Sequence, residues 1–277
     1  MVAIFDDQIT LLINISDNDE IQTIVDYIVK ANLGGSIISN ENYKKSINQH
    51  QDESYRILIE EEIIKFGNKS ILNLYNRGTS DYFSIVCDIA DRFGAKYSKQ
   101  DRISDVELSI ILAILANAWQ KMSKENRKYF IDVLEISSKL SKKIPSSLPF
   151  SAVQSAVETS GAAAFNVIFI VANAVSKTLL GRDLPIHKGS KIAPVRSSFV
   201  VPIGEVINDI WESLNLAGPA YRLTIPCAIH IALLRQQNLI DRCVICGTPV
   251  TRSNKYCPNC GTDLNEDILN PGAEFVE

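Results

Sequence analysis

Four cysteines near the C-terminus have the residue type and the spacing of a metal site. Cys243 and Cys246 form one C-x-x-C pair, and Cys257 and Cys260 form a second pair ten residues later. Each C-x-x-C turn offers two thiolates from one tight loop, and tetrahedral Zn²⁺ takes four such ligands at about 2.3 Å. Glycine follows each pair, as at Gly261, and permits the positive φ that such a turn often needs. The sequence therefore predicts a zinc ribbon.

The four cysteines would close the coordination shell of a single ion. Catalytic zinc keeps one position open for water or substrate, so we expect this ion to be structural. Zinc-finger peptides bind zinc with apparent free energies of about 10–16 kcal/mol. Ordinary domains are stabilised by roughly 5–15 kcal/mol in total. We therefore expect the ribbon to be folded with zinc and disordered without it.

Two other roles for the cysteines fit less well. A redox C-x-x-C begins a helix in a βαβ unit and does not come in duplicate. Disulfides would imply export, but the first ten residues contain Asp6 and Asp7 and lack the pattern of a signal peptide. The remaining cysteines, Cys87 and Cys227, lie alone in apolar stretches. All six fit a reducing cytoplasm.

The charge of the ribbon bears on what it binds. Residues 239–277 carry three basic and six acidic side chains, and four thiolates with one Zn²⁺ add further negative charge. Phosphate binding needs a cationic surface, so nucleic acid is a poor match. Arg242, Arg252 and Lys255 form the candidate contact with a partner, which we expect to be a protein.

The rest of the chain offers little acid–base chemistry. It has three histidines, and it contains no H-E-x-x-H, no G-x-S-x-G and no P-loop. His230 lies in an apolar stretch, where a hydrogen-bonded core histidine is the favoured role. We assign no catalytic residues and expect a non-enzymatic protein.

Helical periodicity dominates the elements that would carry the ribbon. Ser16 and Asp17 can cap one helix, Ser80 or Asp81 begins another, and Gly94 stands where that second helix ends. The stretch from Asp105 is apolar on all sides, which indicates a buried central helix. A run at 223–234 contains Pro226, which would fit the first turn of a helix capped by Thr224. The expected fold is mainly α, with a multi-helix body and a small C-terminal β zinc ribbon.

Residues 159–176 have no charged side chain and permit two interpretations. Eighteen helical residues span about 27 Å, slightly less than a hydrocarbon core of about 30 Å. Asn166 and Asn173 interrupt the apolar run, which favours the central helix of a soluble bundle. In the other interpretation this segment and the run at 223–234 form a hairpin that enters a bilayer. The basic connector between them would then meet anionic headgroups.

Charge also varies along the chain. The net charge is −4, but residues 121–196 carry 12 basic and 5 acidic side chains, whereas residues 1–120 carry 11 basic and 18 acidic. We expect the acidic block to pack against the basic one. This explains the uneven charge more simply than a basic face that binds phosphate or anionic lipid. Prolines and lysines at 139–149 predict a boundary near residue 145. We expect an N-terminal helical domain at 1–145, an apolar helical region at 146–238, and the ribbon with its acidic tail at 239–277.

Three stretches of the helical body resemble a YaaW-like family of bacterial proteins. They are IEEEIIKFGNKSILNLYNRGTSDYFSIVCDIADRFGAKY (59–97), WQKMSKENRKYF (119–130) and GPAYRLTIPCAIHIALLRQ (218–236). They follow the order that they have in the family. The resemblance covers most of residues 5–236 and implies a mostly helical bacterial protein, with no reaction and no catalytic residues to carry over. The zinc ribbon is an addition to the usual family body.

The sequence thus favours a cytoplasmic, non-enzymatic interaction or adaptor protein whose structural zinc ribbon docks a protein partner. The alternative is a membrane-active stress or defence effector that inserts residues 159–176.

Overall fold

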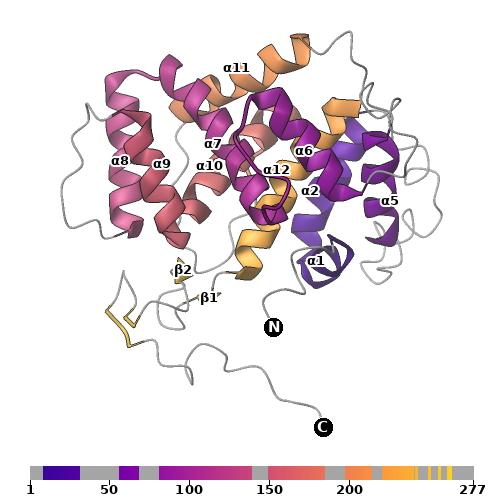
Figure 1. Cartoon of the computed structure of the whole chain (residues 1–277), viewed down its shortest axis with the longest axis horizontal. Helices are drawn as coiled ribbons and strands as arrows, with labels where there is room; N and C mark the ends of the chain where they lie inside the picture. The colour runs from indigo at the N-terminus through magenta and orange to yellow at the C-terminus, as the bar shows by residue number, and fades with distance from the viewer. Residues whose placement is uncertain are drawn as a thin grey trace.

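A computed structural model of the chain describes residues 9–31, 56–68, 81–138, 149–184, 197–213, 220–239, 241–242, 249–250, 255–256 and 261–263. Its elements are α1 (Ile9–Ile15), α2 (Asn18–Lys30), α5 (Arg56–Gly67), α6 (Tyr82–Phe93), α7 (Ile103–Lys121), α8 (Lys124–Ser138), α9 (Phe150–Thr159), α10 (Gly161–Leu180), α11 (Ser197–Ser213), α12 (Ala220–Leu239), β1 (Asp241–Arg242) and β2 (Pro249–Val250). The strands lie below the helical body (Figure 1). The mainly α fold is therefore confirmed.

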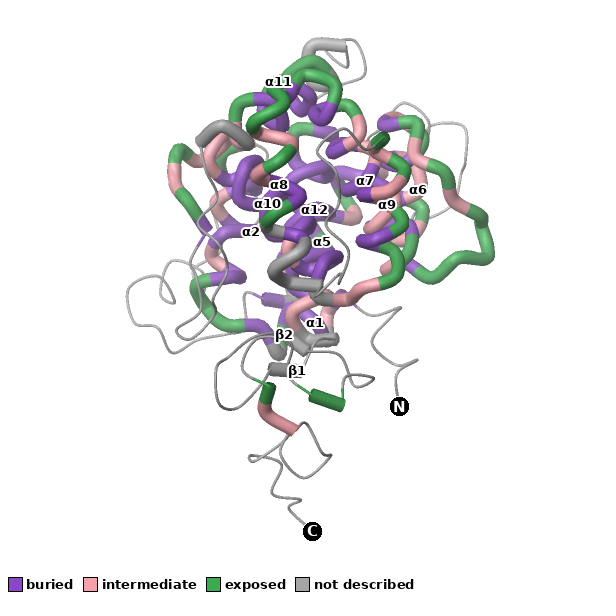
Figure 2. The backbone as a smooth tube through the Cα atoms, turned by 90° about the vertical axis from the view of Figure 1, so that its left-hand side faces the viewer, coloured by how far each residue is buried: buried purple, intermediate pink, exposed green. Residues whose placement is uncertain are grey.

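Three helices, α7, α10 and α12, form the centre of the body. Each packs against the other two, and the remaining helices surround them. Figure 2 shows buried backbone along α10 and α12 in the middle of the molecule. The apolar stretch expected to be a buried central helix is α7, where Ile111, Ile114 and Leu115 are inaccessible to solvent. The burial is not complete, because Asp105, Asn117 and Gln120 are exposed and Ser109 and Ala113 are half-buried, so one side of α7 reaches the surface.

Local capping signals in the sequence place several helix ends correctly. Asp17 and Glu20 form a capping box at the start of α2. The Asp81 carboxylate accepts a hydrogen bond from the Ser84 backbone N–H at 2.8 Å at the start of α6. Gly94 ends α6 in the left-handed region with φ of 65°.

The predicted start of α12 is wrong. The helix begins at Ala220, and Thr224 does not cap it: the Thr224 hydroxyl donates to the Ala220 carbonyl one turn earlier, at 3.2 Å. Pro226 therefore lies inside the helix, where it lacks the N–H of a normal helical bond. The buried surroundings of this turn, with Leu223, Ile225 and Cys227 all inaccessible, hold the helix together across the proline.

One apolar core runs through the described helices, with members from Ile9 in α1 to Leu234 in α12. The predicted boundary near residue 145 lies outside the described residues. The division into domains at 145 and 238 stays a prediction.

Two helices, α7 and residues 163–180 of α10, are long and apolar enough to cross a membrane by length and composition alone. The α10 segment is 72% buried inside the protein. The apolar run 159–176 is also not one helix, because α9 ends at Thr159 and the Ser160 hydroxyl caps α10. Asn173 is bound inside the protein: its side-chain oxygen accepts from the Leu184 N–H at 2.6 Å, and its amide donates to Asp183 at 2.9 Å. These bonds suit a helix built for a protein interior.

Candidate metal centre

The four cysteines lie outside the described residues, but the residues that flank the first pair do not. β1 pairs with β2 in the antiparallel sense, with Asp241 opposite Val250 and Arg242 opposite Pro249. The segment 243–248, which contains Cys243 and Cys246, thus begins and ends at two paired strands.

The second pair is flanked in the same way. Tyr256 and Asp263 form an antiparallel bridge around residues 257–262, which contain Cys257 and Cys260. Gly261, directly after the second cysteine, has φ of 77°. This is the left-handed conformation that the sequence predicted there, and a side chain would disfavour it. Paired backbone therefore flanks both C-x-x-C motifs.

The donor set fits zinc. Four thiolates would satisfy a tetrahedral Zn²⁺ without a water ligand. Among the described residues, no group of three or more His, Cys, Asp or Glu side chains is placed to hold a metal. The assignment of Cys243, Cys246, Cys257 and Cys260 as ligands of one ion stays a prediction.

The expected partner contact is only partly described. Lys255 and Tyr256 are both exposed, and the Lys255 ammonium lies 5.6 Å from the centre of the Tyr256 ring. Arg242 lies in β1 opposite Pro249, and Arg252 lies outside the described residues. Sequence reasoning did not include Tyr256, although an aromatic residue beside the second C-x-x-C is visible in the sequence.

The ribbon is attached to the body at two places. β1 begins two residues after the end of α12, so the ribbon follows directly from a central helix. β2 lies against α10, which is another of the three central helices. The ribbon therefore follows α12 in the chain and touches α10 in space, next to the lower end of the body in Figure 1.

A buried ion pair holds the last turns of α12 in place. The Arg235 Nε donates to Glu107 of α7 at 2.9 Å, and the two side chains are 3% and 2% exposed. The Tyr82 hydroxyl of α6 donates to the same carboxylate at 2.9 Å. Burial and the Glu107 charge raise the pKa of Tyr82 well above its usual value, so its hydroxyl remains a donor. The sequence analysis did not predict this set. Its sign in the sequence is an acid, Glu107, and a base, Arg235, that each stand among mostly apolar residues.

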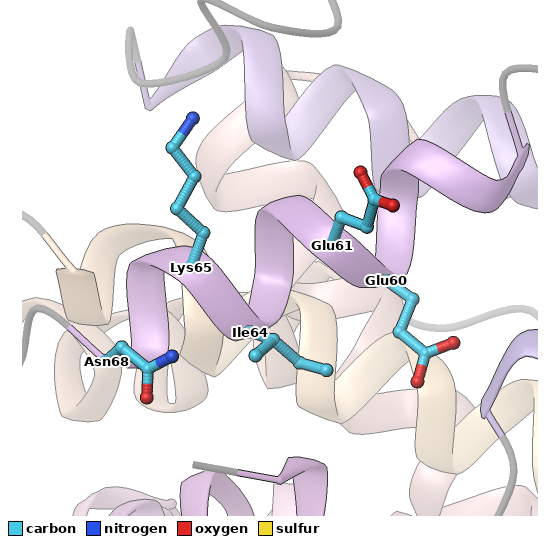
Figure 3. Close-up of a pocket in the computed structure, with 5 residues that line it drawn as sticks. All are labelled: Glu60, Glu61, Ile64, Lys65 and Asn68. Carbon is cyan, nitrogen blue, oxygen red and sulfur yellow. The ribbon is translucent and has the colours of Figure 1, made fainter. Parts of the chain in front are cut away.

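A hollow of about 560 Å³ lies along α5. Glu60, Glu61, Ile64, Lys65 and Asn68 line it, and Figure 3 shows Glu60 and Glu61 pointing in different directions. Burial, and then the neighbouring Glu61 charge, raise the pKa of Glu60. The side chains do not converge on one point. We assign no chemistry to this hollow.

His230 is the core histidine that the sequence predicted. It is 2% exposed, and its Nε2 lies 3.1 Å from the Glu20 backbone oxygen. Cys227 is inaccessible, as expected of a small buried apolar residue, and Cys87 is half-buried.

Comparisons with known proteins agree with both parts of the chain. A family profile described as a zinc-ribbon domain matches residues 242–264, which include all four cysteines. A UPF0174 protein of Helicobacter pylori strain J99 is 30% identical over 200 residues, covering 71% of this chain and 78% of the relative. The UPF0174 protein YaaW of Escherichia coli K12 is 25% identical over 210 residues, covering 75% and 82%. No solved structure matches the chain. With its helical body matched over most of its length and a zinc-ribbon domain at the C-terminal end, this chain belongs to the UPF0174 family of YaaW-like proteins.

Proposed function

We propose that the chain is a non-enzymatic adaptor of the bacterial cytoplasm, whose zinc ribbon docks a protein partner. The observation that carries the proposal is the position of Tyr256. This aromatic side chain is 51% exposed, next in the chain to the predicted zinc ligand Cys257, in a ribbon whose strand β2 lies against α10. Exposed aromatic residues on a fixed support are typical anchors of protein interfaces.

The charge and the burial favour a protein over the other partners. The ribbon and its tail carry twice as many acidic as basic side chains, which opposes binding to a phosphate backbone. The membrane-active alternative needs α10 to leave the body. This would break the hydrogen bonds of Asn173 and expose an interior helix that contacts α7, α11 and α12.

Site-specific photo-crosslinking in cells tests the proposal. A photo-reactive phenylalanine derivative replaces Tyr256 in the full chain, and in a matched control it replaces Lys128, an exposed residue of α8. We expect one discrete protein adduct from position 256 and none from position 128. We also expect the adduct to disappear when Cys257→Ser is added, because the ribbon then no longer holds its zinc.

Three outcomes would contradict the proposal. The first is an adduct with lipid or nucleic acid alone at position 256. The second is no adduct from a chain that retains its zinc. The third is the same adduct with and without the Cys257→Ser substitution.

A further inference from the structure

The His230 ring joins α12 to α2 through a contact that fixes its tautomer. Its Nε2 lies 3.1 Å from the backbone oxygen of Glu20. Because a carbonyl oxygen only accepts, Nε2 must carry a hydrogen and donate it. The neutral ring therefore has its lone pair on Nδ1, which has no hydrogen-bond partner among the described residues. The contact leaves one buried basic nitrogen available to a second proton.

A proton on Nδ1 would meet no compensating group. The ring lies edge-on to Tyr27 of α2, with 6.0 Å between the ring centres. Burial, together with repulsion from the Arg182 guanidinium, lowers the pKa of His230 to about 4. The Cys227 thiol on the same helix stays neutral because burial raises its pKa. Acids on the helices around α12 already have partners: Glu20 with the Asp17 N–H, Asp26 with Arg182, Glu62 with Lys65, Asp88 with Tyr221, and Glu107 with Arg235.

We propose that the contact between α2 and α12 is a latch that opens when His230 takes up a proton. A charged ring must reach water, and α2 supplies both the carbonyl that holds the ring and the tyrosine beside it. The closed form holds the neutral ring, so the latch is at full strength above the free-histidine pKa of about 6.5. It weakens as the pH falls through that value towards 4.

α2 is the element able to leave while the centre of the body stays intact. It lies at one side of the body beside α1 (Figure 1), whereas α7 and α10 each pack against more of the helices. Its ion pair between Asp26 and Arg182 is partly exposed, and pairs of this kind hold weakly. Opening uncovers the buried apolar stripe of Ile21, Ile24, Val25 and Ile28.

Hydrogen exchange of the full chain tests the latch. Exchange is followed by mass spectrometry at pH 7 and pH 4, with labelling times scaled for the intrinsic rate. The open population of α2 is expected to rise about a hundredfold, because the pKa of the ring differs by about 2.5 units between the open and closed forms. Protection in α7 should remain. His230→Gln keeps a donor for the Glu20 carbonyl but takes no proton, so its α2 should stay protected at both pH values.

His187→Gln is the matched control, because it removes another histidine of the chain and should behave as the wild type. The latch is wrong if His230→Gln loses protection in α2 as the wild type does, or if α2 and α7 lose it together. Titration of the wild-type histidine rings by NMR gives an answer that does not depend on how the variant folds. We expect one ring to titrate near 4, and three rings titrating near the free value of about 6.5 would overturn the proposal.

Discussion

Replacing Cys257 and Cys260 by serine is expected to unfold the ribbon and leave the helical body folded. Zinc bound to peptides of this kind contributes about 10–16 kcal/mol of apparent free energy. The described ribbon otherwise has only two strands of two residues and one isolated bridge. Among the described residues of the ribbon, nothing of comparable strength would hold it without the metal, so we expect it to unfold.

Metal analysis and hydrogen exchange measure this effect together. We expect the bound zinc to fall from one ion per chain to none, and the paired amides of β1 and β2 to lose their protection. Exchange in α7 and α12 should stay within a few-fold of the wild type. Cys87→Ser is the control, because Cys87 is a free thiol in α6 and its loss should leave the zinc bound. A double-serine chain whose strands remain protected would show that the ribbon does not depend on metal.

Replacing Arg235 by alanine is expected to lower the free energy of unfolding by about 3–5 kcal/mol, because it removes the buried cation that pairs with the Glu107 carboxylate. This is a large part of the roughly 5–15 kcal/mol that stabilises a domain. Chemical denaturation at pH 7, followed by helical circular dichroism, measures the loss. A change below about 1 kcal/mol would mean that the pair does not hold the two helices as the structure indicates.

A triple variant separates the missing partner from the missing side-chain volume. Tyr82→Phe, Glu107→Leu and Arg235→Met together remove every polar member of the set while keeping most of its volume. Apolar replacements of whole buried ion pairs are often neutral or stabilising by about 1–4 kcal/mol. We therefore expect the triple variant to recover most of the stability that Arg235→Ala loses. Equal loss in both variants would place the effect in packing and not in the unpaired charge.

The sequence predicted those features that a few neighbouring residues decide. The helix start at Asp17, the N-cap at Asp81 and the helix end at Gly94 all depend on contacts within one helical turn. The four-cysteine spacing and the positive φ of Gly261 are local in the same way. Such signals are complete within a short window of sequence.

Contacts between distant residues could not be predicted. The Arg56 guanidinium donates to the Ile13 and Ser16 carbonyls at 2.6 and 2.9 Å, across about 40 positions of the chain. Glu107 and Arg235 stand 128 positions apart. Nothing near either residue marks the other, because only the packing of the helices brings them together. Pro226 was misplaced for a related reason: tertiary burial overrides the local preference of proline for a first turn.

X-ray absorption at the zinc edge of the purified full chain shows whether the four cysteines bind one ion. We expect one zinc per chain, surrounded by four sulfur atoms at about 2.3 Å and by no oxygen or nitrogen. A chain that is purified without zinc, or a shell in which oxygen or nitrogen replaces any of the sulfur atoms, would contradict this expectation.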